Sequence, residues 1–411
     1  MKPCKIIVIG GGASGMTAAI AAKRTNQQAK VHILEHKDVL GKKLLSTGNG
    51  RCNFTNAVMT KECFFSDSID VAAHVLERFG TEDTLRFFGE LGILAKDRNG
   101  YFYPRSEQAA AVADVLRIAV RQNGITVDCN AHVQEVNRTK SGFVIKTNER
   151  TYKCDRVILS TGGKAASVLG SDGSGYGLAK CLGHSIVPVV PALVQLKAEQ
   201  SPLTKASGVR TDAKVTAVVD GREAGFDTGE LQITSYGISG IPVFQISRHT
   251  AKGLYAKKMA EVWIDFMPSM SLGEWEAFLD VRKQGKEDWT IADFFVGIFN
   301  QKLTPCLLKC AGLRAHALVG EISEAQWKSL SSVCKKFSLQ IIDTNGFENA
   351  QVCAGGVCLE EIYENTLESR VCQGLFLTGE LLDVEGICGG YNLQWAWASG
   401  FIAGSSAAEQ E

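Results

Sequence analysis

The residues best suited to chemistry lie near the start of the chain, where residues 5–9 form a short, mostly β-branched run. This run enters three glycines spaced Gly-x-Gly-x-x-Gly, at Gly10, Gly12 and Gly15. Gly10 permits a tight turn, Gly12 lets the backbone approach a pyrophosphate, and Gly15 allows a helix to pack closely on its strand. Alone, the spacing is a weak signal for a dinucleotide site.

A helix start and an acidic residue complete this pattern. An alanine-rich stretch follows the glycines, so Ala13 and Ser14 should open a helix whose first N–H groups bind phosphate oxygens. The next apolar strand, residues 31–34, ends in Glu35, 20 residues after the last glycine. A carboxylate there can hold a ribose hydroxyl. An ordinary glycine-rich βαβ turn is the alternative, and it is disfavoured because all five features occur in order.

A polar loop follows this unit, with the sequence GKKLLSTGNGRCNFTN at residues 41–56. Its backbone N–H groups can point at a ligand, and Lys42, Lys43 and Arg51 can meet phosphate. Gly48 lies in the same loop and is assigned to the cofactor with them. A solvated loop would have the same composition, and this alternative stays open.

Two later glycine-rich segments also face a cofactor in our interpretation. Gly162 follows an apolar strand and precedes a second glycine cluster at residues 170–177, which we interpret as a loop lining the cofactor and not as a second dinucleotide site. In residues 379–394, Glu380 can bind ribityl hydroxyls, and Asn392 lies at a helix start. A flavin that takes up hydride gains negative charge at N1 and the C2 oxygen, which a helix N-terminus stabilises. A glycine-rich helix cap is the alternative.

The order of these motifs predicts a nucleotide-binding domain of α/β class that is interrupted by an insertion. We expect a Rossmann-type FAD-binding domain over residues 1–190 and 339–411, with a buried strand near the end of the chain completing it. The proline-spaced residues 188–191 mark the change. We expect an inserted β-rich domain at 191–271 and a helical subdomain at 272–338.

Composition excludes several classes of protein. The 411 residues include 44 basic and 44 acidic side chains, so no nucleic-acid partner is indicated. The 13 cysteines contain no C-x-x-C pair, and with 7 scattered histidines we expect no metal site and reduced thiols. A redox role for Cys52 is disfavoured because no cysteine lies nearby in sequence. Without a run of roughly 18 apolar residues, we expect no membrane span and a cytoplasmic protein.

With these motifs in place, the chain resembles the bacterial YhiN-like flavoproteins, the aminoacetone-oxidase-like NAD(P)/FAD family, over essentially its full length. The most specific parts are residues 41–56, 234–240 and 379–400. The resemblance implies bound FAD, with Val133 acting through its backbone near the adenine. By position it implies FAD contacts at Ala13, Ser14, Glu35, Lys42, Lys43, Arg51, Val133, Gly162, Glu380 and Leu393.

The family resemblance also implies redox chemistry on a small molecule. Its known activities include amine oxidation and reduction of bile-acid 3-oxo-Δ4,6 intermediates, and we favour reduction of such an enone by reduced flavin. A flavin amine oxidase and a non-catalytic redox sensor are the alternatives, and NADH or NADPH is a candidate electron donor. Family members often carry a histidine where this chain has Ser235, which makes Tyr236 the nearest candidate acid. Packing of Tyr236 under its loop stays open, as does the oligomeric state.

Overall fold

The computed structural model describes residues 3–409, which divide into two compact units. The first unit contains the chain up to Val189 and again from Gln351, and the second contains Val190–Ala350. The first boundary between the units was predicted after residue 190 and lies after Val189, one residue earlier. The chain was predicted to re-enter the first unit at residue 339, but it does so at Gln351, twelve residues later. A strand that closes the barrel of the second unit lies in between.

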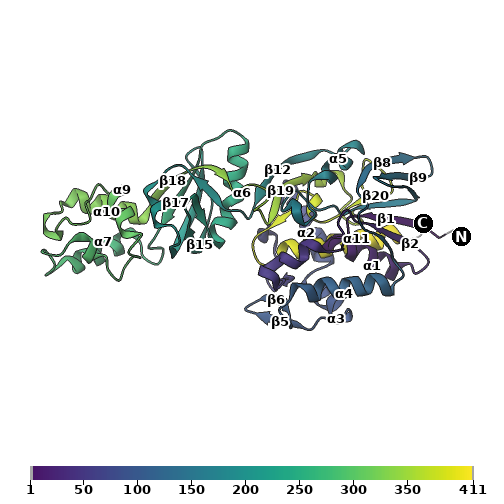
Figure 1. Cartoon of the computed structure of the whole chain (residues 1–411), viewed down its shortest axis with the longest axis horizontal. Helices are drawn as coiled ribbons and strands as arrows, with labels where there is room; N and C mark the ends of the chain where they lie inside the picture. The colour runs from purple at the N-terminus through teal and green to yellow at the C-terminus, as the bar shows by residue number, and fades with distance from the viewer. Residues whose placement is uncertain (1–2, 410–411) are drawn as a thin grey trace. The chain divides into compact units, whose positions relative to one another are not determined.

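A five-stranded parallel sheet forms the centre of the first unit, in the order β20-β11-β1-β2-β7. Its strands are β1 (Lys5–Ile9), β2 (Lys30–Leu34), β7 (Thr126–Asp128), β11 (Arg156–Leu159) and β20 (Leu375–Leu377). Strand β20 pairs with β11, so a segment from the end of the chain completes a sheet begun at its start (Figure 1). Strands β1, β11 and β20 are mostly apolar and buried, as expected of the centre of a parallel sheet covered on both faces, whereas the edge strand β7 is partly exposed.

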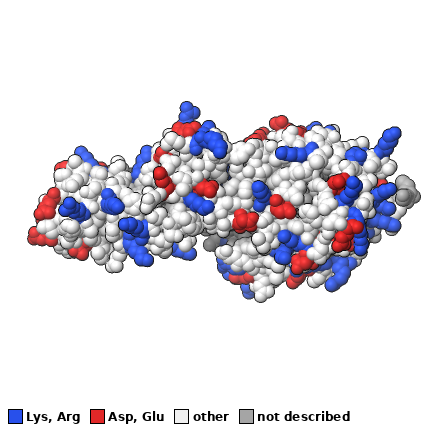
Figure 2. Space-filling view, turned by 45° about the horizontal axis from the view of Figure 1, so that its top comes forward, with Lys and Arg blue, Asp and Glu red and all other residues white. Residues whose placement is uncertain are grey.

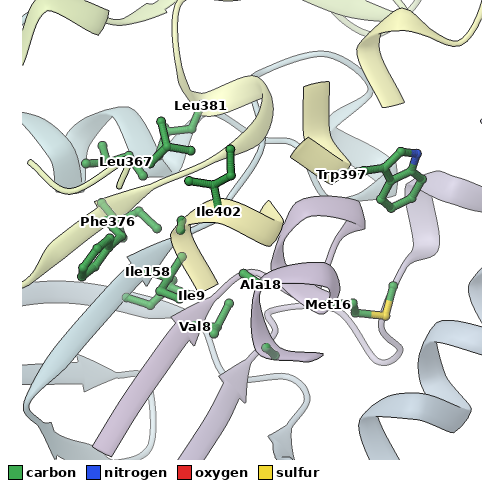
Figure 3. Packing of buried hydrophobic residues seen from close by; sticks show 14 of the residues in the cluster. Val8, Ile9, Met16, Ala18, Ile158, Leu367, Phe376, Leu381, Trp397 and Ile402 are labelled. Atoms are coloured by element: carbon green, nitrogen blue, oxygen red, sulfur yellow. The ribbon is translucent and has the colours of Figure 1, made fainter. Parts of the chain in front are cut away.

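Two helices from opposite ends of the chain pack closely against each other in this unit, α1 (Ala13–Thr25) and α11 (Tyr391–Ala408). Figure 3 shows Ala18 of α1 and Ile402 of α11 in the same apolar cluster as Ile158 and Phe376 of the sheet. Around them lie α2 (Ile69–Arg78), α3 (Thr81–Glu90), α4 (Ala109–Gln122) and α5 (Ser174–Cys181). Helices α2 and α3 follow each other closely in sequence and are divided near Gly80, whose N–H donates to the Asp83 carboxylate.

Smaller sheets surround this core. One contains β8 (Val133–Thr139), β9 (Gly142–Thr147) and β10 (Thr151–Cys154), and another contains β3 (Thr55–Asn56), β5 (Ala95–Arg98) and β6 (Tyr101–Pro104). Strand β4 (Phe64–Phe65) pairs with β21 (Glu385–Gly386). Strand β12 (Ile186–Ala192) leads into the second unit, and β19 (Val352–Val357) follows the return.

The second unit contains a closed barrel in the order β13-β16-β15-β14-β17-β18. Its strands are β13 (Leu196–Ala198), β14 (Arg210–Val219), β15 (Arg222–Ile233), β16 (Gly237–Ser239), β17 (Ala260–Asp265) and β18 (Phe337–Thr344). Helix α6 (Ile241–Tyr255) packs against β14 and β15. Strand β18 pairs with both β17 and β13 and buries Phe337, Leu339 and Ile341. It therefore belongs to the barrel, although the sequence placed most of it in the nucleotide domain.

The helical block of the second unit consists of α7 (Leu272–Lys283), α8 (Ile291–Phe294), α9 (Thr304–Cys310) and α10 (Glu324–Lys335). Its aromatic residues, such as Trp275 and Phe294, join the barrel interior in one apolar cluster. The Lys335 ammonium donates to the Asp265 carboxylate at 2.6 Å and to the Met267 carbonyl at 2.8 Å, which ties α10 to the end of β17. Barrel and helices thus share one core.

Candidate functional site

The three glycines of the first turn differ in how closely other atoms surround them. Gly10 has φ +99°, and a Cβ added there would lie 2.4 Å from the Ser160 carbonyl oxygen. A Cβ on Gly15 would lie 1.9 Å from the Gly10 oxygen, whereas one on Gly12 would meet no atom within 4 Å. Gly10 and Gly15 therefore allow close packing, and Gly12 borders open space where a phosphate can approach.

Helix α1 presents free donors to that space. Gly12 is its N-cap residue, no side chain caps it, and the first intrahelical hydrogen bond runs from the Met16 N–H to the Gly12 oxygen. The N–H groups of Ala13, Ser14 and Gly15 thus have no acceptor within the helix. Together with the helix dipole, they form an anion-binding site of the kind that holds a pyrophosphate.

Glu35 lies beside the glycine turn, at the end of β2. Its Oε2 accepts a hydrogen bond from the Gly11 N–H at 2.7 Å, and its Oε1 accepts one from the Lys37 N–H at 2.8 Å. The side chain is buried, and the His36 Nδ1 lies 3.3 Å from Oε1. The carboxylate therefore stabilises the glycine turn, and it lies at the end of β2, the position predicted for a ribose acceptor.

The polar loop contains the 3₁₀ segment η1 (Lys42–Gly50), whose basic residues have partners in this structure. Lys42 pairs with Asp38 at 3.1 Å, and Lys43 pairs with Glu380 at 2.8 Å. The Arg51 guanidinium lies 5.9 Å from the centre of the Tyr103 ring. Since Lys43 and Glu380 are 337 positions apart, the fold brings together two predicted site residues from opposite ends of the chain.

The interior of η1 has three non-helical residues, and Gly48 is one of them, with φ +56°. A Cβ there would lie 3.0 Å from the Asn53 nitrogen. Gly162 has φ +73° and would place a Cβ 2.9 Å from the Ser171 Oγ. Val133 is buried at the start of β8, the edge strand of its sheet, so one side of that strand's backbone has no neighbouring strand.

Helix α11 provides a second uncapped N-terminus. Its N-cap residue is Gly390, with φ +93°, and the first intrahelical bond reaches Gly390 from Gln394. The N–H groups of Tyr391, Asn392 and Leu393 are thus free of intrahelical acceptors. The Asn392 amide is engaged with the Gly386 backbone, accepting from its N–H at 2.9 Å and donating to its oxygen at 2.8 Å. Asn392 therefore holds the 386–390 loop on the helix, and its backbone N–H remains for a ligand.

Some residues of the site gave no signal in the sequence. Gln394 is fully buried, and its Oε1 accepts from the hydroxyls of Thr55 and Thr84 at 2.7 and 2.8 Å, which fixes the start of α11. The Cys353 N–H donates to the Glu380 Oε1 at 2.9 Å. Both contacts join segments that are distant in sequence, so only the folded chain reveals them.

The cysteine thiols fit no redox role at this site. Burial raises the pKa of the Cys52 thiol to about 12, so the reactive thiolate is not populated near neutral pH. The same cause raises the pKa of Cys353 to about 12. Within residues 3–409, no group of three or more histidine, cysteine or acidic side chains is arranged to hold a metal ion. In the same range, no helix combines the length and the apolar character needed to cross a membrane.

Tyr236 lies in the second unit, in the tight connection from β15 to β16. Its carbonyl accepts from the Ala198 N–H at 2.9 Å, and 38% of the residue is exposed. Its hydroxyl has no partner among the described residues, 3–409. Gly237 follows with φ +153°, where a Cβ would lie 2.2 Å from the Leu196 oxygen. The backbone here is thus fixed by close packing, and the phenol is available to solvent.

Acidic and basic side chains are mixed on the face of the molecule seen in Figure 2. Figure 2 shows acidic and basic side chains interspersed on the visible face of each unit, without a large field of one sign. The 44 basic and 44 acidic residues balance over the whole chain. The face seen in Figure 2 shows no basic stripe of the kind typical of polyanion-binding proteins.

The chain is similar to a known protein family, to proteins of known activity and to solved structures. A family model described as the HI0933-like protein Rossmann domain matches residues 4–406. A 3-dehydro-bile acid delta(4,6)-reductase from Clostridium scindens is 52% identical over 406 residues, 99% of both chains. A ribosomal RNA dihydrouridine synthase from Haemophilus influenzae is 28% identical over 410 residues, 98% of both. Among solved structures, the FrdA subunit of E. coli quinol fumarate reductase covers 99% of this chain and 70% of its own, with 16% identity and a TM-score of 0.50.

The family match confirms the predicted family resemblance and the Rossmann-type fold. The likeness to the fumarate reductase subunit supports the fold alone. The features predicted to contact FAD, namely the uncapped α1 N-terminus, the Glu35 carboxylate and the uncapped α11 N-terminus, all lie in the first unit of a chain of this family.

Proposed function

The chain belongs to the family of HI0933-like Rossmann-domain proteins, and we propose that it is an FAD-dependent reductase of a bile acid or related steroid. The bond that it reduces is a carbon–carbon double bond conjugated to a 3-oxo group, as in a 3-oxo-Δ4,6 steroid. One observation carries the proposal, the 52% identity to the Clostridium scindens 3-dehydro-bile acid delta(4,6)-reductase over 99% of both chains.

The arrangement of the first unit supports this chemistry. FAD, when bound, supplies the hydride. The N–H groups at the start of α1 would hold its pyrophosphate, and Glu35 would hold its ribose. The N–H groups of Tyr391, Asn392 and Leu393 would stabilise negative charge on the flavin ring, where charge grows as the ring is reduced.

The reaction also needs a proton and a donor for the substrate. Hydride addition to the far carbon of an enone leaves an enolate, whose oxygen needs a hydrogen-bond donor and whose carbon needs a proton. We propose Tyr236 as the proton donor, because it is partly exposed and its hydroxyl has no hydrogen-bond partner among residues 3–409. We further propose NADH or NADPH as the source of electrons for FAD.

Anaerobic reoxidation of the flavin tests the reductase proposal. The purified protein is loaded with FAD, reduced with NADH, NADPH or light, and mixed with a 3-oxo-4,6-diene bile acid. We expect the flavin to reoxidise and the steroid to gain two hydrogen atoms for each double bond reduced. The saturated 3-oxo analogue is the control and should leave the flavin reduced. The alternative amine oxidase would behave differently. An amine would reduce its flavin, oxygen would reoxidise the reduced flavin, and the diene would not.

Replacement of Tyr236 by phenylalanine separates the acid from a structural side chain. We expect the rate of steroid reduction to fall by about 10²- to 10⁴-fold, with FAD binding unchanged. Tyr255, which is 60% exposed on α6, provides the matched control variant Tyr255→Phe. A parent rate in Tyr236→Phe would assign the proton to another group or to water.

Reduction of uridine in ribosomal RNA is a second candidate. The relative from Haemophilus influenzae is named for that activity and is aligned over 98% of this chain. Its 28% identity is well below that of the bile-acid reductase, and the balanced charge does not favour RNA. Formation of dihydrouridine in an unmodified ribosomal RNA transcript, with no turnover of the diene, would establish this candidate in place of the first.

A further inference from the structure

The side chain of Asn53 has a buried acceptor that no protein group satisfies. The residue lies between η1 and β3, and 8% of its surface is exposed. Its Oδ1 has no hydrogen-bond partner anywhere in the described chain, residues 3–409. Buried polar atoms in native proteins are nearly always paired, so an atom of this kind calls for a ligand or another specific explanation.

The position of this oxygen is at the N-terminus of α11. A Cβ added to Gly390, the N-cap residue, would lie 2.9 Å from the Asn53 Oδ1. The three free N–H groups of the helix start immediately after Gly390. An acceptor and a group of donors thus border the same end of the helix.

The side-chain amides of the two neighbouring asparagines already have hydrogen-bond partners. Asn392 is bonded to Gly386 through both its oxygen and its nitrogen. Asn56 donates to the Gly389 oxygen at 3.0 Å and accepts from the Val58 N–H at 3.1 Å. Of these three asparagines, Asn53 is the one whose oxygen remains for a ligand.

The pyrimidine edge of a flavin has the complementary pattern, since its C2 oxygen accepts hydrogen bonds and the adjacent N3–H donates one. We propose that the Asn53 Oδ1 accepts a hydrogen bond from the flavin N3–H, beside the C2 oxygen that the start of α11 stabilises. This inference rests on the proposed function, because it requires bound FAD. Asn53 is then a cofactor-positioning residue that also influences how easily the flavin is reduced.

Two substitutions separate this role from a structural one. Asn53→Ala removes the acceptor, and we expect FAD to bind about 2- to 10-fold more weakly. The melting temperature of the apoprotein should not fall, because no protein hydrogen bond is lost. Asn53→Asp keeps an acceptor but adds a negative charge where reduced flavin gains one. We expect oxidised FAD to bind nearly as before and the reduced form at least tenfold more weakly.

The experiment measures the FAD dissociation constant by fluorescence titration of apoprotein and the flavin reduction potential by dye equilibration. A tenfold loss specific to the reduced form lowers the two-electron potential by about 30 mV. Asn137, which is exposed on β8, supplies the matched controls Asn137→Ala and Asn137→Asp, expected to behave as the parent.

Weaker FAD binding in Asn53→Ala, together with a lowered potential in Asn53→Asp, supports the assignment. Parent affinity in the first variant and parent potential in the second overturn it while leaving the FAD enzyme intact. If Asn53→Ala does not fold, the potential of Asn53→Asp alone decides. Failure of the unaltered apoprotein to bind FAD would overturn the proposed function as well as this inference.

Discussion

The contact between α1 and α11 makes a quantitative prediction about one glycine. A Cβ added to Gly400 would lie 2.4 Å from the Ser14 carbonyl oxygen, about 1 Å short of the 3.4 Å at which ordinary contact begins. The obstructing atoms belong to the α1 backbone and cannot rotate away. Gly400→Ala therefore forces the two helices apart, and it does so at Ser14, beside the glycine turn that we propose binds the phosphates of FAD.

The expected energy follows from two opposing effects. Alanine gains up to about 1 kcal/mol over glycine in a helix interior. Overpacking of a well-packed interface costs about 1–3 kcal/mol, and obstruction by backbone belongs to the upper part of that range. We therefore expect Gly400→Ala to lower the free energy of unfolding by about 2 kcal/mol. Displacement of the α1 donors should also weaken FAD binding by about tenfold.

A matched control exists in the same unit. Gly89 is exposed in α3, and a Cβ there would meet no atom within 4 Å. Gly89→Ala should therefore raise stability by up to about 1 kcal/mol, through the same gain in helix propensity. Urea unfolding of the apoprotein measures both variants, and fluorescence titration measures FAD affinity. If Gly400→Ala is as stable as the parent, or is stabilised like Gly89→Ala, the packing argument is refuted.

Three further predictions concern single side chains. Glu35→Ala leaves the Gly11 N–H without its buried acceptor, so urea unfolding should show a loss of about 1–3 kcal/mol, and FAD should bind about ten- to hundredfold more weakly; unchanged values of both would contradict the role of this carboxylate. Burial, and to a smaller extent the nearby cations Arg248 and Lys252, lowers the pKa of His249 to about 4. Between about pH 6.5 and pH 4 the imidazole is therefore protonated in the unfolded chain but neutral in the folded chain. The free energy of unfolding is greatest above about pH 6.5 and falls as the pH drops towards 4, by a maximum on the order of 3 kcal/mol. His249→Gln should flatten this dependence in unfolding curves across that range, and an unaltered slope would count against it. Lys335→Met leaves the Asp265 carboxylate without its ammonium partner, and thermal and urea unfolding should show a loss of about 3 kcal/mol; parent stability would show that this pair does not hold α10 to the barrel.

The sequence alone determined the features that depend on local backbone requirements. Gly10, Gly12 and Gly15 predicted a tight turn, an open approach and a close helix contact, and each glycine has that environment in the structure. Glu35 was predicted from its distance to these glycines, and it lies against the turn. Such features are readable because each depends on one residue type within a single strand–turn–helix unit.

Tertiary structure decided what depends on contacts between distant segments. The pairing of β18 with β13 and β17 placed residues 337–344 in the barrel, because their alternating apolar side chains fill its interior. The pairing of Lys43 with Glu380 and the isolation of the Asn53 oxygen beside Gly390 arise in the same way. Local motifs marked Lys43 and Glu380 as candidates but not their pairing, because the partners in all these contacts lie far apart in sequence and are selected by the packing of the whole chain.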